Sequence, residues 1–458
     1  MDIGPVVQTL KWCLELFRPA IFTSATGFNT QNRRTSHLDG LRGFAALIVY
    51  LFHHEGWIHT ITNEERILAS AFGYGNNYYF ACLPGVRIIF AGGHFAVGIF
   101  FVISGYVLST KPLMCINAGE YSKLGEVLSS SLFRRWLRLY IPIIFTTFIY
   151  MTSWHFLNIH ATPDPKGNYW DEIYNWYIEF RDFSFIFRDS SDPSFTYNRH
   201  TWSVPAEFKG SIVIYTALMA FSRCTRNCRL WCGVGLIVYF LYIVDGWFCA
   251  MFLGGMLLCD LDLLAERNNL PDFFAALSPF KGILFYLSFF VSIYLGGVPY
   301  QSGDGAELRV SPGWYYISFL QPQAVTDCKW FYLFWASIFL VTSISRIRLL
   351  KVFFEGRFNQ YLGRISYALY LVHGPVLWLL GSRMYAATGW SGDCAIHVPA
   401  CENQFSLPKN KPMGLEMSFL LPHLILLPVT LWMAEIVTRL FDQTSVQFSQ
   451  WLYGKMLL

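Results

Sequence analysis

About ten apolar stretches, each long enough or nearly long enough to cross a bilayer as a helix, occur in this chain of 458 residues. Apolar residues make up 54% of the sequence and charged residues only 14%, whereas about 25% of the residues of a soluble protein are charged. Because so few charges cannot cover a soluble surface, we expect an all-α polytopic membrane bundle of about ten transmembrane helices. The predicted spans are 41–58, 93–110, 139–157, 202–221, 229–244, 246–263, 281–297, 330–346, 364–382 and 414–438.

Three of these spans carry a more detailed expectation. The span at 93–110 is rich in glycine and could be re-entrant, which would change the count by one. The spans at 229–244 and 246–263 nearly touch, so they predict a tight helical hairpin.

The chain divides into a short leading segment, a membrane domain and a short tail. The stretch from Val6 to Phe22 is amphipathic and predicts a helix lying on the membrane surface. The expected parts are an N-terminal amphipathic, cytosolic segment at 1–32, a membrane domain at 33–440 and a cytosolic tail at 441–458.

Lysines and arginines are distributed unequally between the two sides of the predicted bundle. With the N-terminus placed in the cytosol, 21 of them fall in cytosolic segments and 11 on the far side. The positive-inside rule therefore predicts two cytosolic termini and an even number of spans. We expect a multi-pass protein of the endoplasmic reticulum or the plasma membrane. A net charge of only +4 gives no reason to expect a nucleic-acid partner.

The first predicted span holds a cation and an imidazole on one face. Arg42 and His53 are eleven residues apart, which is about three full helical turns and about 16 Å along the axis. Ionisable groups inside a membrane are costly, so each is a candidate for function. The alternative is an arginine that reaches to the interface and a histidine that bonds to a neighbour.

The next two spans add a hydroxyl and an arginine cluster. Ser104 lies within the glycine-rich second span. Arg134, Arg135 and Arg138 open the third span at the cytosolic boundary. Arginine binds phosphate through two parallel hydrogen bonds, so this cluster could clamp a phosphorylated ligand. Ordinary positive-inside anchoring is the alternative.

A carboxylate and another histidine lie in later spans. Glu207 is several residues inside the fourth span, and a membrane carboxylate usually has a cationic partner. His53 or an arginine of the cluster could be that partner. In the ninth span, His373 precedes a predicted kink at Pro375, and we interpret it as a structural hydrogen-bonding residue.

Several classes of site are not indicated. The sequence has no Walker A motif, GxSxG elbow, HExxH motif or GxGxxG after a strand. His155 and His160 lie close together without an evident third ligand. We therefore predict no metal site.

Five motifs together resemble the acyltransferase-3 family of integral membrane acyltransferases. The first is LDGLRG, in which Arg42 stands eleven residues before His53. The others follow in the family's order and extend the likeness over nearly the whole chain. They are FFVISGYVLS (100–109), RRWLRLYIP (134–142), HTWSVPAEF (200–208) and LGRISYALYLVHG (362–374).

The resemblance implies a helical membrane enzyme that moves an acyl group, usually acetyl, from acyl-CoA to a hydroxyl. The matching positions imply that Arg42 and His53 are essential and that Arg135 and Arg138 are important. Glu207 stands alone where many bacterial members have a Glu-Glu-Gln-Phe run, and this form is more similar to the fungal branch. That branch includes enzymes of natural-product pathways, so we expect a fungal secondary metabolite as acceptor.

These observations lead to a hypothesis for each catalytic residue. His53 would be the general base on the acceptor hydroxyl. Glu207 would orient or stabilise that imidazole, and Ser104 would hydrogen-bond the developing oxyanion. Direct transfer and a route through acyl-His53 both stay open.

The donor side of the hypothesis uses the cations at the cytosolic boundary. The phosphates of acyl-CoA, taken as acetyl-CoA, would be held by Arg42 and by the cluster. No permanently bound cofactor is expected. The cluster residues are Arg134, Arg135 and Arg138.

Two alternatives remain at this stage. The same enzyme could pass the acyl group across the membrane to a carbohydrate or a lipid. A proton-coupled transporter would use the same intramembrane His, Arg and Glu side chains, but the chain shows no inverted hydropathy repeat. A homodimer is also left open.

Overall fold

The computed structural model is mainly helical, and the residues that it describes make up most of the chain. The surface helix predicted from Val6 to Phe22 lies outside the described residues. Two strands of two residues each, β1 (Gly73–Tyr74) and β2 (Asn77–Tyr78), pair antiparallel in one small hairpin. The described residues are 34–59, 70–74, 77–156, 165–187, 195–299, 305–390, 401–409 and 415–457.

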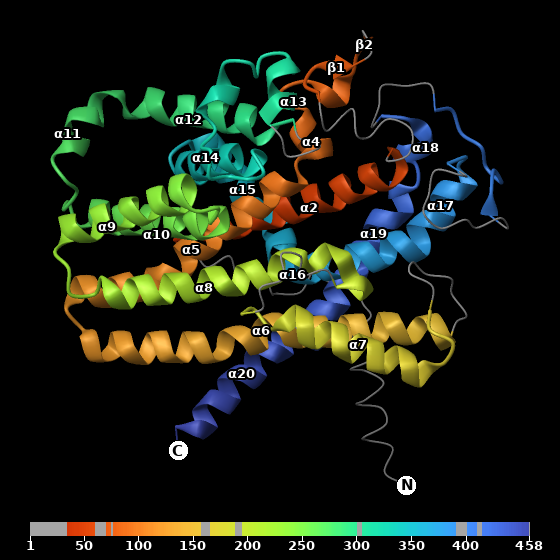
Figure 1. Cartoon of the computed structure of the whole chain (residues 1–458), viewed down its shortest axis with the longest axis horizontal. Coiled ribbons are helices and arrows are strands. Elements are labelled where there is room, and N and C mark those ends of the chain that lie inside the picture. Colours follow the sequence, from red (N-terminus) through yellow and green to blue (C-terminus); the bar gives the residue numbers. More distant parts are fainter. Residues whose placement is uncertain are drawn as a thin grey trace.

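Each of the ten predicted spans coincides with one of the longer helices, and Figure 1 shows several of these lying side by side. The all-α expectation is therefore confirmed. The helices are α2 (Ser36–His59), α5 (Gly93–Ala118), α6 (Tyr121–Phe156), α8 (Ser203–Ala220), α9 (Arg226–Val238), α10 (Trp247–Glu266), α12 (Lys281–Gly296), α14 (Lys329–Ile344), α16 (Arg357–Val376) and α19 (His423–Val437).

The number of membrane crossings is smaller when it is judged by helix length and hydropathy. Five described helical segments are long and apolar enough to cross a membrane. A sixth results if α14 and α15 (Arg348–Glu355), which meet at an angle of 91°, form one broken span. The count of about ten spans thus stays a prediction.

Shorter elements connect and extend these helices. The turns η5 (Tyr239–Ile243), η8 (Leu377–Gly381) and η10 (Thr438–Asp442) are π-helical. The short elements are η3 (Phe80–Cys82), α4 (Arg87–Ala91), α7 (Tyr169–Ser184), η4 (Thr196–Trp202), η5 (Tyr239–Ile243), α11 (Phe273–Leu277), η6 (Ser278–Phe280), α13 (Gly305–Val310), η7 (Ile317–Leu320), η8 (Leu377–Gly381), α17 (Ser382–Ala387), α18 (Met417–Leu420), η10 (Thr438–Asp442) and α20 (Gln443–Met456).

Helices α2 and α16 approach at a pair of glycines. A Cβ atom on Gly43 would lie 2.2 Å from the backbone nitrogen of Gly363. A Cβ atom on Gly363 would lie 2.3 Å from the carbonyl oxygen of Asp39. Small residues permit such contact between helix backbones in membrane proteins. This crossing brings the first and ninth predicted spans, more than 300 residues apart in sequence, into one site.

Helix α5 is continuous, so the re-entrant alternative for the second span is wrong. It packs against α10 through a second pair of glycines. A Cβ atom on Gly105 would lie 2.0 Å from the Phe252 carbonyl oxygen, and one on Gly255 would lie 2.0 Å from that of Val102. The hairpin predicted between the fifth and sixth spans is present, since η5 ends at Ile243 and α10 begins at Trp247.

Helix α12 presents large apolar side chains to the outside of the bundle. Ile283 is 70% exposed and Phe290 is 63% exposed. An apolar surface of this kind is unfavourable in water and suits the hydrocarbon of a bilayer. At the other edge of the molecule, α20 leaves the bundle at an angle after packing along α6 (Figure 1).

Candidate active site

A cavity of about 160 Å³ lies where the arginine-bearing ends of several helices meet. It is lined by residues of α2, α5, α6, α8, α16 and η10. Four cations and two anions border it, so the cavity favours an anionic ligand. The charged residues are Arg42, Arg135, Arg138, Arg364, Glu207 and Asp442.

Arg42 is held in place by the close contact of α2 and α16. Its Nε donates a hydrogen bond of 3.1 Å to Ser366 Oγ, and its Nη2 donates one of 3.1 Å to the Gly363 carbonyl. Asp39 Oδ1 lies 3.4 Å from the same Nη2. The guanidinium is thus positioned by α16 and still lines the cavity.

Glu207 pairs with Arg135, which is one of the two kinds of partner that the sequence left open. Arg135 Nη2 forms an ion pair with Glu207 Oε1, and its Nε donates a 2.9 Å hydrogen bond to Ser211 Oγ. Ser104 Oγ donates to the same Glu207 oxygen at 2.7 Å. The Arg135 and Glu207 side chains are only 10% and 15% exposed. Three predicted site residues therefore form one network on α5, α6 and α8.

This network bears on the roles expected for Ser104 and Glu207. The single hydroxyl proton of Ser104 is engaged by Glu207, so Ser104 could serve an oxyanion only after that bond is exchanged. The Glu207 carboxylate pairs with Arg135, and no hydrogen bond or ion pair joins it to His53 among the described residues.

The other two arginines of the cluster differ in their surroundings. Arg138 lines the cavity. Arg134 does not belong to the lining, and its Nε donates a 2.9 Å hydrogen bond to the Ser130 carbonyl of its own helix. The structure therefore brings together Arg42, Arg135 and Arg138 and leaves Arg134 apart from them.

His53 lies deeper, in a stack of three imidazoles. Its ring centroid is 3.6 Å from that of His200 and 5.1 Å from that of His373. The His200 and His373 rings are 4.7 Å apart and nearly parallel, at 9°. His373 Nδ1 is 3.2 Å from the Leu369 carbonyl oxygen, which agrees with the structural hydrogen bond expected for it.

Among the described residues, these three histidines are the group whose nitrogens lie close enough together to hold a metal ion. One nitrogen of each lies within 4.8 Å of the others. An imidazole binds a metal in the plane of its ring. Three stacked rings with interplanar angles of 9–29° direct their lone pairs side by side rather than toward one point. As placed, the cluster therefore does not have the geometry of a tetrahedral site.

Tyr370 separates the cavity from the imidazole stack. It lines the cavity, and its ring centroid is 5.9 Å from that of His373. Its hydroxyl contacts the His200 carbonyl and lies 2.8 Å from Ser203 Oγ. The charged cavity and the histidines are therefore neighbouring parts of one site.

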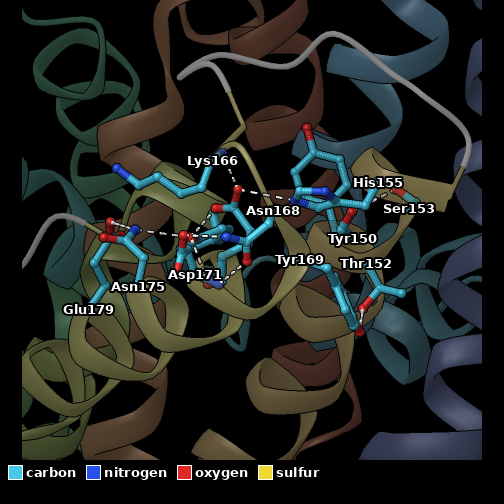
Figure 2. A network of polar contacts seen from close by, with 12 residues as sticks. Tyr150, Thr152, Ser153, His155, Lys166, Asn168, Tyr169, Asp171, Asn175 and Glu179 are labelled. Atoms are coloured by element: carbon cyan, nitrogen blue, oxygen red, sulfur yellow. Dashed lines mark hydrogen bonds and ion pairs between the residues drawn. The ribbon is translucent and has the colours of Figure 1, made fainter.

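A second polar network, on α6 and α7, supports the segment that carries His200. Figure 2 shows the part of this network that contains His155 and Lys166. The buried Glu172 carboxylate accepts from the Lys166 backbone and from the Tyr197 hydroxyl, and it lies 3.3 Å from His155 Nε2. Burial, followed by the hydrogen bond to Glu172, raises the pKa of the Tyr197 phenol above its ordinary range. His155 thus has a carboxylate partner here, and His160 lies outside the described residues.

A stack of three imidazoles beside an arginine-lined cavity, inside a bundle of apolar helices, indicates a helical membrane enzyme. Residues 36–432 match the acyltransferase domain family, and this chain belongs to that family. It is an acyltransferase, as the motifs indicated, and the transporter alternative is set aside.

The relatives are fungal acyltransferases. O-acetyltransferase PaAT-1 of Phomopsis amygdali is 30% identical over 97% of this chain and 89% of its own length. Acyltransferase R4 of a Phoma species is 22% identical over 78% of this chain and 86% of its own. Acyltransferase clz18 of Cochliobolus lunatus is 21% identical over 77% and 84%. No solved structure gives a significant match.

Sequence reasoning did not single out some residues of this site. Arg364 was visible as a charge in the ninth span, but only the fold brings it to the cavity. Asp442 lies in the part assigned to the cytosolic tail. His200 is the first letter of the fourth-span motif, and nothing in the sequence alone indicates that it meets His53.

Proposed function

We propose that this chain transfers an acyl group, acetyl in the first instance, from acyl-CoA to a hydroxyl of a small-molecule acceptor. A fungal secondary metabolite is the proposed class of acceptor, in keeping with the fungal relatives. The observation that carries the proposal is the cavity bordered by four arginines next to the histidine stack that contains His53.

The cavity suits the anionic part of CoA. Arg42, Arg138 and Arg364 would bind its phosphates through charge-assisted hydrogen bonds. Arg135 is tied to Glu207 and Ser211, so we assign it to shaping the cavity as well as to the phosphates.

The reaction centre would lie at His53. The helical rise separates Arg42 from His53 by about 16 Å, an order of length that a pantetheine arm can span. His53 would take the proton of the acceptor hydroxyl as the oxygen attacks the thioester carbonyl. The thiolate of CoA would leave and receive that proton, so the imidazole returns to its neutral form.

The first test replaces the proposed base. In His53→Ala protein, we expect the release of CoA from labelled acetyl-CoA, with a fungal metabolite extract as acceptor, to fall by about 10²–10⁴-fold, because that is the usual contribution of a general base. Binding of acetyl-CoA should be retained, because His53 does not line the cavity.

The control in this experiment is the extract itself. CoA release that needs both the extract and His53 supports the proposal and yields a labelled product. Undiminished transfer by the His53→Ala protein would remove the imidazole from the mechanism. Absence of acetyl-CoA binding in the wild type would contradict acetyl-CoA as the donor.

A further inference from the structure

The imidazole of His200 lies face to face with that of His53. The two centroids are 3.6 Å apart, and the ring planes differ by 21°. This is the closest ring contact of His53 among the described residues, since Phe52 and His373 both lie at 5.1 Å. No hydrogen bond or ion pair joins His53 to a described residue, and its closest aromatic contact is the face of His200.

The segment that carries His200 is fixed from two sides. Toward α16, Asn198 Nδ2 donates a 2.9 Å hydrogen bond to the Leu371 carbonyl, and the Tyr370 hydroxyl donates to the His200 carbonyl. Toward α7, the backbone nitrogen of Thr196 donates to Glu179 Oε2 at 3.0 Å. Glu179 also accepts from Asn175, as Figure 2 shows. These contacts fix the backbone of the short turn that carries the His200 side chain.

The adjoining helix leaves room for this ring. A Cβ atom on Gly374 would lie 2.7 Å from His200 Nδ1. That nitrogen is buried and has no hydrogen-bond partner in the described part of the chain. A buried nitrogen without a partner is unfavourable. Hydrogen bonding of this nitrogen therefore does not explain where the ring lies. The ring packs against those of His53, His373 and Trp378, and His53 is the nearest of the three.

The nearby carboxylates are engaged elsewhere. Glu207 pairs with Arg135. Glu55, on the same helix as His53, lies 3.1 Å from His59 Nδ1. An imidazolium formed at His53 would thus have no carboxylate partner among the described residues, and a catalytic base in a membrane interior needs some stabilisation of its cation.

We propose that His200 is a positioning residue that stacks on His53 and stabilises its cation through the face of a neutral ring. This inference rests on the proposed function. As the acceptor O–H bond breaks, its proton and His53 form an N–H bond, and the oxygen's electron pair attacks the thioester carbon. The positive charge on His53 then faces the electron-rich surface of His200, as in other cation–π contacts. When the C–S bond breaks, the thiolate takes the proton and the stack is neutral again.

Two substitutions separate the ring face from the nitrogens. His200→Phe keeps an aromatic face and has no nitrogen, whereas His200→Gln keeps a polar group and has no ring. We expect kcat to fall about tenfold in His200→Gln and to stay within about threefold of wild type in His200→Phe, since a tenfold loss corresponds to about 1.4 kcal/mol of transition-state stabilisation. KM for acetyl-CoA should change in neither, because His200 does not line the cavity.

The controls address folding and metal binding. Acetyl-CoA binding and thermal stability in detergent show whether each variant is folded. His423→Phe replaces another histidine, bonded to Tyr50 and outside the stack, and should retain wild-type kcat. The transition-metal content of purified wild-type protein is measured in parallel and needs no variant.

Each outcome decides the inference. Loss of kcat in His200→Gln with retention in His200→Phe supports it. Full activity of His200→Gln, or equal loss in both folded variants, overturns it. Stoichiometric metal in the wild type that His200→Phe removes also overturns it and makes the cluster a metal site. If the wild-type protein transfers no acyl group, the proposed function itself fails. If the wild type is active and substitution of His200 has no effect, only the inference about His200 fails.

Discussion

The three arginines of the α6 cluster are not equivalent, although they lie within about a turn and a half of one helix. Arg135 is tied to two protein partners and Arg134 to its own backbone, while Arg138 lines the cavity. The sequence indicated that these side chains gather near one boundary. It could not assign their partners, because Glu207 and Ser211 are more than 70 residues away and meet Arg135 only after the helices pack.

This difference leads to a prediction at the scale of single residues. Arg138→Ala should weaken acetyl-CoA binding by about 10–100-fold, because a hydrogen bond to a charged group contributes about 1.5–3 kcal/mol. Arg134→Ala should leave the Kd within about twofold. Titration of the two purified variants with acetyl-CoA, followed calorimetrically, measures both effects. An equal loss in the two would mean that the whole cluster binds CoA, as the sequence alone suggested.

At the scale of elements, the site depends on how closely α2 and α16 approach. The contact at Gly43 and Gly363 places Arg42 beside Ser366 and allows His53 to reach His373. The ten apolar stretches predicted the helices themselves, because hydrophobic length is a local property of the sequence. Which helices become neighbours is not local, so neither this contact nor the Glu207 network could be predicted.

The same reasoning accounts for the elements that were not expected. The π-helical turns η8 and η10 interrupt apolar runs that read as continuous helices, and η10 carries Asp442 to the cavity. Helix α7 and turn η4 lie mostly between two predicted spans, where the polar sequence predicted no transmembrane helix. They matter because η4 holds His200.

Adding one methyl group tests the α2–α16 contact. In Gly43→Ala, the new Cβ would lie 2.2 Å from backbone at Gly363, which has to move. We expect a loss of about 1–3 kcal/mol of stability, the usual cost of overpacking, with a fall in kcat as Arg42 and His53 shift. The matched control is Gly125→Ala in α6, where no atom lies within 4 Å of the added Cβ. Thermal unfolding in detergent should show a lower midpoint for the first variant only, and equal midpoints would contradict the contact.

At the scale of the whole molecule, the cavity and the stack lie at different depths along the same helices. The cavity gathers residues assigned to the cytosolic boundary, namely Arg42, Arg138 and Arg364. His53, eleven residues further along α2, lies toward the other side. If CoA enters from the cytosol, the orientation inferred from the positive charges and the position of the cavity must agree, and each becomes a test of the other.

A single substitution can test that orientation. Phe405, which is 71% exposed, lies two residues after Asn403 in the loop assigned to the far side. Phe405→Thr creates an Asn-x-Thr acceptor on Asn403, and N-glycosylation takes place only on the luminal side of the endoplasmic reticulum. We expect a glycosidase-sensitive mass increase for this variant in a eukaryotic host. The same acceptor on a flexible C-terminal tag should stay unmodified, because the tail is predicted to be cytosolic. The reverse pattern would place the arginine-lined cavity on the luminal side, away from cytosolic CoA, and would contradict both the predicted topology and the cytosolic entry of the donor.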